Sequence, residues 1–187
     1  NLILAQLHVA FLRAHNAIVD DRDCDFEEAK KILIQHYQLI VLENFLEQIC
    51  DPSIVKRIRY EGPTFFNPSP ESFYMPLEFS VAAYRFGHSK VRASYDHFNS
   101  RHEGGGFNFL FGFTNQRLPD DWVISWPSFL DTENEDRRPR RIDTTLSGPL
   151  LSLHEEQLSG HDTGVRNLAV RNLLRGYMLR MPTGQAV

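Results

Sequence analysis

Apolar residues recur at every third or fourth position along the first fifty residues, which is the pattern of one face of an amphipathic helix. This pattern predicts a helix over residues 2–19 and a longer helix over residues 26–49. The polar run that starts at Asp20 separates them, because short polar residues favour turns. The apolar stripes contain Leu4, Leu7, Ala10, Phe11, Ala14 and Ile18 in the first helix, and Ile32, Leu39, Leu42, Leu46 and Ile49 in the second.

Prolines and glycines divide the rest of the chain. Pro63, Pro68 and Pro70 mark a loop, because proline sustains neither a helix interior nor a strand ladder. After this loop we predict a third long helix over residues 71–98 and a fourth over residues 165–180. Between them, three consecutive glycines and a charged run indicate a long, mostly irregular excursion over residues 100–150. The predicted fold class is therefore mainly α, with little or no sheet.

Composition narrows the possible functions. The chain has 187 residues, which is long enough to bury the core of one domain. Its net charge of −4 argues against nonspecific nucleic-acid binding, which needs a basic surplus. No apolar run approaches the roughly 20 residues that cross a bilayer, so we predict no transmembrane segment. Cys24 and Cys50 have no metal-ligand spacing.

The ends of the sequence suggest a piece of a longer protein. The helical pattern is already running at Leu2, and the chain stops soon after a turn signal at Gly184. We therefore expect a partial domain that requires the rest of its parent chain.

The strongest candidate for chemistry is a histidine within an apolar and aromatic segment. His88 follows Arg85 by three positions, which places both on one face of a helix. A haem needs such a face, because it takes an imidazole to its iron, apolar contacts to its ring and cations for its propionates. The alternative is a core histidine beside a surface arginine, and on these residues alone that alternative is the more common case.

Three segments, taken in order, resemble the animal haem peroxidase superfamily, which includes myeloperoxidase-like enzymes, cyclooxygenases and bacterial relatives. Residues 83–88 resemble its proximal-histidine helix, and residues 7–16 are similar to the helix after its distal arginine motif. Residues 167–176 together with 181–185 resemble the segment after the proximal helix in bacterial members. The resemblance implies a haem-peroxidase-like helical domain with long irregular loops, of which residues 1–187 form one part, from a bacterial protein.

The resemblance also implies roles for four residues. His88 matches the axial ligand of the haem iron, and Asn172 matches the asparagine that accepts the outer N–H of that imidazole. Arg85 matches a residue near the haem propionates, and Arg175 matches a second arginine near the same edge. The alternative for Arg175 is a cation on a helix surface. The distal histidine and arginine that cleave the peroxide have no match in this chain, so no catalytic residue is assigned.

The implied activity is that of the intact parent. It is haem-dependent reduction of hydrogen peroxide or an organic peroxide, coupled to oxidation of an electron-donor substrate and suited to a response to oxidative stress. The resemblance implies a secreted or periplasmic location, and it leaves a calcium site open because that site lies in upstream sequence. Without the distal residues, we expect the isolated chain to be a poor catalyst.

Two other functions compete with this interpretation. A fatty-acid dioxygenase of the same superfamily places a tyrosine three positions before the proximal histidine, whereas this chain has Arg85 there and Tyr84 one residue away. The second competing function is that of a non-enzymatic helical module that has lost haem. His97, His102 and Glu103 also suggest a metal site, but solvated loop residues are the better interpretation.

Overall fold

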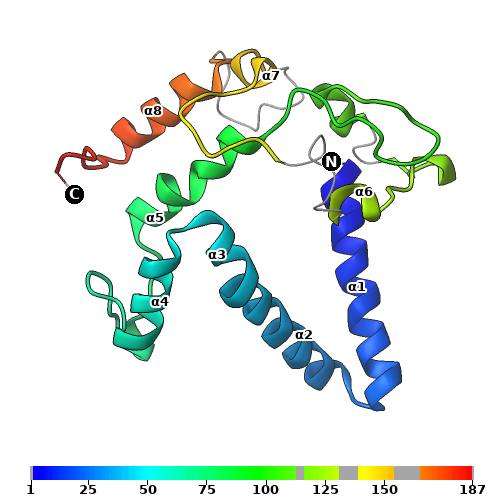
Figure 1. The fold of residues 1–187 in the computed structure, drawn as a ribbon, viewed down its shortest axis with the longest axis horizontal. Coiled ribbons are helices and arrows are strands. Elements are labelled where there is room, and N and C mark those ends of the chain that lie inside the picture. Colours follow the sequence, from blue (N-terminus) through cyan, green and yellow to red (C-terminus); the bar gives the residue numbers. More distant parts are fainter. Residues whose placement is uncertain (1, 113–115, 131–138, 154–164, 187) are drawn as a thin grey trace. The chain divides into compact units, whose positions relative to one another are not determined.

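The computed structural model describes residues 2–112, 116–130, 139–153 and 165–186 (Figure 1). Within these ranges the chain is helical with no β-strand, and one isolated bridge joins Ser94 to Gly106. The prediction of a mainly α fold is confirmed. The contacts divide the chain into two compact units, which we call unit 1 (Asn1–Gln6 and Met75–Val187) and unit 2 (Leu7–Tyr74). That residues 1–187 belong to one domain stays a prediction.

Two helices of unit 2, α2 (Phe26–Ile40) and α4 (Pro52–Glu61), start at aspartate caps. Asp25 accepts a hydrogen bond from the Glu28 N–H at 2.9 Å, and Asp51 accepts from the Ser53 N–H at 2.8 Å, so each carboxylate satisfies a free N–H of the first turn. Phe11 packs edge-to-face on Tyr37 with ring centroids 5.7 Å apart. The elements are α1 (Leu2–Arg22), α2 (Phe26–Ile40), a π-helical turn η1 (Val41–Phe45), α3 (Leu46–Ile49), α4 (Pro52–Glu61) and the 3₁₀ turn η2 (Pro70–Ser72).

Helix α1 corrects one prediction from the sequence. Its 21 residues are long and apolar enough to cross a membrane by length and composition, with Arg13 as the one Lys, Arg, Asp or Glu before Asp20. The statement that no segment approaches this length is therefore wrong, because the polar residues within α1 are few enough to keep its average apolar. The helix is weak evidence for a membrane span, since a core helix of a soluble protein passes the same test.

Unit 1 is built from shorter helices joined by irregular segments. The predicted fourth helix is found as α8, and Asn167 caps it by accepting hydrogen bonds from the N–H groups of Ala169 and Val170. The described parts of residues 100–150 contain only short helical turns. The elements are α5 (Leu77–Val81), η3 (Ala83–Lys90), η4 (Phe107–Phe111), η5 (Asp120–Trp122), α6 (Pro127–Leu130), α7 (Gly148–Leu151) and α8 (Leu168–Met178).

The prediction of one long helix over residues 71–98 is wrong. The structure has the short helix α5, then the 3₁₀ helix η3, and leaves helical conformation at Val91. Beyond that point the backbone pairs with a distant segment instead. The Tyr95 N–H donates to the Gly105 carbonyl at 2.9 Å, and the Phe107 N–H donates to the Ala93 carbonyl at 2.8 Å. This tertiary pairing satisfies groups that a continuing helix would have used.

The core of unit 1 is held by side-chain amides as well as by apolar contact. Gln6 donates to the Trp122 carbonyl at 3.2 Å and accepts from the Ile124 N–H at 2.9 Å. Asn99 donates to the carbonyls of Asp121 and Val123. These two amides supply hydrogen bonds that regular secondary structure would supply elsewhere. The buried core residues are Leu2, Phe98, Leu110 and Ile124.

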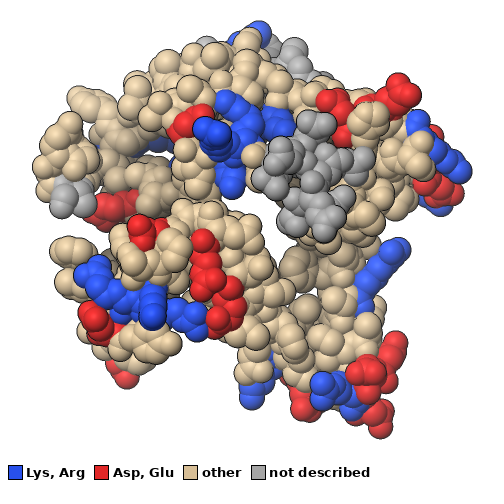
Figure 2. All heavy atoms as spheres, viewed as in Figure 1, with Lys and Arg blue, Asp and Glu red and all other residues tan. Residues whose placement is uncertain are grey.

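Charged side chains of both signs share the surface. Figure 2 shows lysine, arginine and acidic side chains interspersed on the visible face. Among the described residues of unit 2, ion pairs join Lys30 with Glu27 at 3.0 Å, Arg22 with Asp21 at 3.7 Å, and Arg59 with Glu43. The absence of a nucleic-acid partner was inferred from the net charge, and it stays a prediction.

Candidate functional site

The structure brings His88 and Asn172 into contact. Nδ1 of His88 on η3 lies 3.0 Å from Nδ2 of Asn172 on α8, although 84 positions separate the two residues. Both side chains are half-buried. One nitrogen of the imidazole is therefore held by an amide within unit 1.

The orientation of the Asn172 amide decides which ring nitrogen carries the proton. With Nδ2 donating to Nδ1 of His88, the proton of a neutral ring sits on Nε2. A half-turn of the amide brings Oδ1 to the same place, where it accepts from Nδ1–H and leaves the Nε2 lone pair available. The second orientation is the one in which His88 can bind a metal, because a ligating imidazole donates its other N–H to an acceptor.

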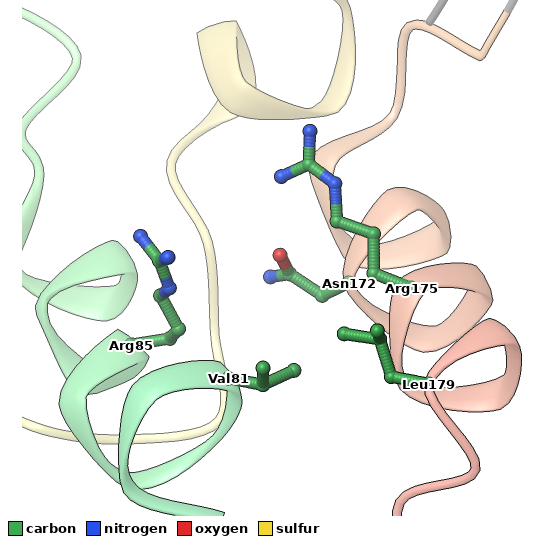
Figure 3. A pocket seen from close by; sticks show the side chains of 5 residues that line it. All are labelled: Val81, Arg85, Asn172, Arg175 and Leu179. Carbon is green, nitrogen blue, oxygen red and sulfur yellow. The ribbon is translucent and has the colours of Figure 1, made fainter. Parts of the chain in front are cut away.

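Two arginines flank this pair. A pocket of about 210 Å³ is lined by Val81, Arg85, Asn172, Arg175 and Leu179. Figure 3 shows Val81 and Leu179 facing each other across it, with Arg85 and Arg175 on opposite sides of Asn172. The Nε of Arg85 donates to the Ser80 carbonyl at 3.0 Å, which fixes the plane of the guanidinium. The pocket therefore combines a small apolar floor with two exposed cations.

The surroundings of His88 favour its neutral form. Burial, followed by the positive charges of Arg85 and Arg175, holds the pKa of His88 below its ordinary value. Each cause penalises the protonated ring. Neutral imidazole is the form that binds metals, so the electrostatics agree with a role as a ligand.

The donor set fits a haem better than a bare metal ion. No group of three or more His, Cys, Asp or Glu side chains able to hold a metal ion exists among the described residues. A metal that brings its own macrocycle needs only one protein ligand on this side, together with apolar contacts and cations for its carboxylates. His88, the Val81–Leu179 floor and the two arginines supply these three requirements.

Sequence reasoning missed part of this arrangement. Val81 lies four positions before Arg85, and Leu179 lies four positions after Arg175, so helical spacing carried a signal for both. The hydrogen bond from Nε of Arg85 to the Ser80 carbonyl could not be predicted from the sequence, because it depends on the break between α5 and η3.

The weaker metal candidate is a structural cluster instead. The His102 ring stacks on Trp122 with centroids 4.0 Å apart and on Phe98 at 5.4 Å. Its Nε2 lies 3.4 Å from a carboxylate oxygen of Asp121. His97 and Glu103 pair through their backbones, since the His97 N–H donates to the Glu103 carbonyl. The ring stacking assigns His102 to packing.

The site thus places a histidine in contact with an amide and near two arginines, which are residue types that a haem site uses. Comparison with known families agrees: the model of the animal haem peroxidase family matches residues 1–148, and the chain belongs to that family. The match includes Arg85 and His88, whereas Asn172 and Arg175 lie beyond it.

Several animal peroxidases are similar to parts of the chain. A peroxidase-like protein of Margaritifera margaritifera is 34% identical over 105 residues, which are 50% of this chain and 13% of that protein. Human thyroid peroxidase is 29% identical over 97 residues (47% and 10%), and Aedes aegypti chorion peroxidase is 27% identical over 136 residues (65% and 15%). The matches thus cover 10–15% of each relative's length. No solved structure matches the chain.

Proposed function

We propose that this chain is the proximal part of a haem peroxidase domain. In the intact protein it reduces hydrogen peroxide or an organic peroxide and oxidises an electron-donor substrate. The observation that carries the proposal is the contact between His88 and Asn172, which joins η3 to α8 beside two arginines. Family membership supports it at the coarser level of a peroxidase-type protein.

Each residue of the pair has a defined task in this proposal. His88 binds the iron through Nε2, and Asn172 accepts the Nδ1–H, which fixes the ring's tautomer and orientation. A neutral amide is a weaker acceptor than a carboxylate, so the imidazole keeps less imidazolate character and donates less strongly to the metal. Haem supplies the redox chemistry when bound.

The two arginines bind the carboxylates of the same group. Arg85 is held by the Ser80 carbonyl through Nε, so its terminal nitrogens are available to a carboxylate in the pocket. Arg175 reaches the pocket from α8. Arg85 and Arg175 would hold the haem through its two propionates and would so set its orientation at the site.

The finer assignments belong to the proposal as well. We infer a bacterial source from the motifs of residues 167–185, although the relatives reported above are animal proteins. A role in the response to oxidative stress and a secreted or periplasmic location follow from the family resemblance, and calcium is left open. The rest of the parent chain supplies the peroxide-cleaving residues, so the isolated chain is a poor catalyst.

Haemin titration followed by absorption tests the proposal in the chain and in its full-length parent. We expect a Soret shift that His88→Ala abolishes and that Asn172→Ala alters. Added imidazole should restore the shift in His88→Gly, because the free base fills the vacated position. His102→Phe is the matched control and should titrate like the unchanged protein. Haemin binding that ignores His88 would contradict the assignment.

The two rival functions predict different results. A fatty-acid dioxygenase consumes oxygen with linoleate, and the parent is expected not to do so because Arg85 occupies the position of the tyrosine. A helical module without cofactor shows no Soret band in the purified parent. No specific feature of the described residues favours either rival.

A further inference from the structure

Gly87 precedes His88 in η3, and its backbone does not require a glycine. Among the glycines in the described ranges, the one with a positive φ is Gly62, at 84°. Every L-residue can therefore adopt the backbone conformation at position 87. Glycine within a helical segment is less stable than alanine, because it loses more conformational freedom on folding. The choice of glycine here needs another reason.

Packing within the described chain does not supply that reason. A Cβ built on Gly87 meets no atom within 4 Å. Two of the three glycines of the loop behave differently, whereas Gly106 also has open space: a Cβ on Gly104 would come 2.7 Å from Oδ1 of Asp96, and a Cβ on Gly105 would overlap the ring of Phe109. Those two glycines make room for their own chain, whereas Gly87 leaves space that the described chain does not fill.

The empty space adjoins the candidate ligand. A 3₁₀ helix has three residues per turn, so Arg85 and His88 share one stripe of η3, and Tyr84 and Gly87 share the next. A porphyrin is much wider than the imidazole that binds its metal. A ring bound at His88 therefore extends over the adjacent backbone of residue 87, where a side chain would meet it.

We propose that Gly87 determines which group fits at this site, because the missing side chain lets the flat face of a porphyrin reach the η3 backbone. The proposal rests on the proposed function, since it takes His88 as the ligand that brings the ring to this face. The bond between a metal and an imidazole nitrogen has a fixed length, so a Cβ at position 87 either tilts the ring or weakens the bond.

The test is a size series at position 87, made in the full-length parent with two probes. Gly87→Ala and Gly87→Val are titrated with haemin and with iron-free protoporphyrin IX. Gly148→Ala and Gly148→Val are the matched controls, because Gly148 also has open space around its Cβ and no positive φ. Thermal unfolding of the cofactor-free variants measures any purely structural effect.

We expect Gly87→Val to weaken the binding of both porphyrins by about tenfold or more, and Gly87→Ala to weaken it less. The cofactor-free Gly87→Ala protein should unfold at the same or a higher temperature, because alanine reduces the entropy of the unfolded chain. The Gly148 variants should bind both probes unchanged. Equal binding by Gly87→Val and Gly148→Val would overturn the proposal, as would unfolding of the cofactor-free Gly87→Ala protein at a clearly lower temperature.

The outcomes separate this proposal from the proposed function. His88→Ala reduces haemin binding if His88 is the ligand, whatever the result at position 87. Protoporphyrin without iron forms no axial bond, so its response to the size series reports on the shape of the face alone. A parent that binds neither probe would overturn both proposals.

Discussion

Unit 1 contains two histidines in contrasting surroundings. His88 is half-buried, contacts the amide of Asn172 and lies near two positive charges. His102 stacks on Phe98 and on Trp122, which also contact each other, and its Nε2 lies near the Asp121 carboxylate. The first has one nitrogen held by a neutral group and lies near a pocket, while the second stacks on two aromatic side chains.

The contrast teaches which surroundings make a histidine available to a ligand. Aromatic contacts and an adjacent carboxylate hold the His102 ring in place, so its contribution is packing. Burial and two nearby cations favour the neutral form of His88, and its Nε2 has no hydrogen-bond partner among the described residues. Residue type alone did not distinguish the two, and their neighbours do.

The largest expected effect concerns the aromatic cluster. Phe98→Ala should lower the free energy of unfolding by about 3–5 kcal/mol, because it leaves a cavity beneath His102 and Trp122. Phe98 is 2% exposed, and both tryptophans belong to unit 1, so tryptophan fluorescence during denaturant unfolding measures the loss. Phe65→Ala is the control, since its side chain is 98% exposed and its removal should cost little. A similar loss in both variants would contradict this account of the core.

The next effect separates the two histidines by affinity. Asn172→Ala should weaken haemin binding about 10- to 100-fold, as removal of a partner that orients a metal ligand does. His102→Phe should leave haemin affinity unchanged, because that ring serves packing. Equilibrium titration of both variants followed at the Soret band makes the measurement. If the two substitutions weakened binding equally, the distinction between the histidines would be lost.

A smaller effect concerns the helix that carries the partner of His88. Asn167→Ala should cost about 1 kcal/mol, because the N–H groups of Ala169 and Val170 lose their acceptor. Hydrogen exchange of the α8 amides measures the loss. Asn167→Asp keeps an acceptor at the cap and should exchange like the unchanged chain. Equal exchange in all three proteins would show that the cap contributes nothing to α8.

The smallest effect is electrostatic. The pKa of His88 should lie below its ordinary value of 6.5 in the cofactor-free chain, and NMR titration of the ring measures it. As pH falls below 6.5, His88 takes up a proton in the unfolded state before it does so in the folded state. The free energy of unfolding therefore decreases with falling pH until the pH is below the pKa of His88 in the folded state. Arg85→Gln should raise the pKa only part of the way, because burial is the larger cause. Arg101→Gln is the control. An equal rise in the pKa of His88 in that variant would show that the charge of Arg85 is not a specific cause of the lowered pKa.

The sequence predicted local features better than distant ones. The helices near residues 2–19, 26–49 and 165–180 were indicated by their local apolar periodicity, although several positions of the predicted stripes, such as Leu4, Leu39 and Leu42, are exposed. The helix expected over residues 71–98 failed because Ala93 and Tyr95 pair with a segment about ten positions away, which periodicity does not record. Tertiary contacts override local preference at such places.

The candidate site shows the same limit. The spacing of Arg85 and His88 marked the η3 side of the candidate site from the residues alone. Asn172 lies too far along the chain for any spacing rule, and only the family resemblance pointed to it. The pairing of His102 with Asp121 depends on how Asn99 holds the backbone near residue 121, and no sequence pattern indicated it.

The distance along the chain between His88 and Asn172 has a consequence for synthesis. At about 5–20 residues per second, the ribosome adds the 84 residues between them in about 4–17 s. During that interval η3 exists without the amide that orients its imidazole, and a metal or porphyrin captured then would meet a freely rotating ring. Faithful insertion of a cofactor therefore belongs to the period after translation of α8, when the ring has its partner.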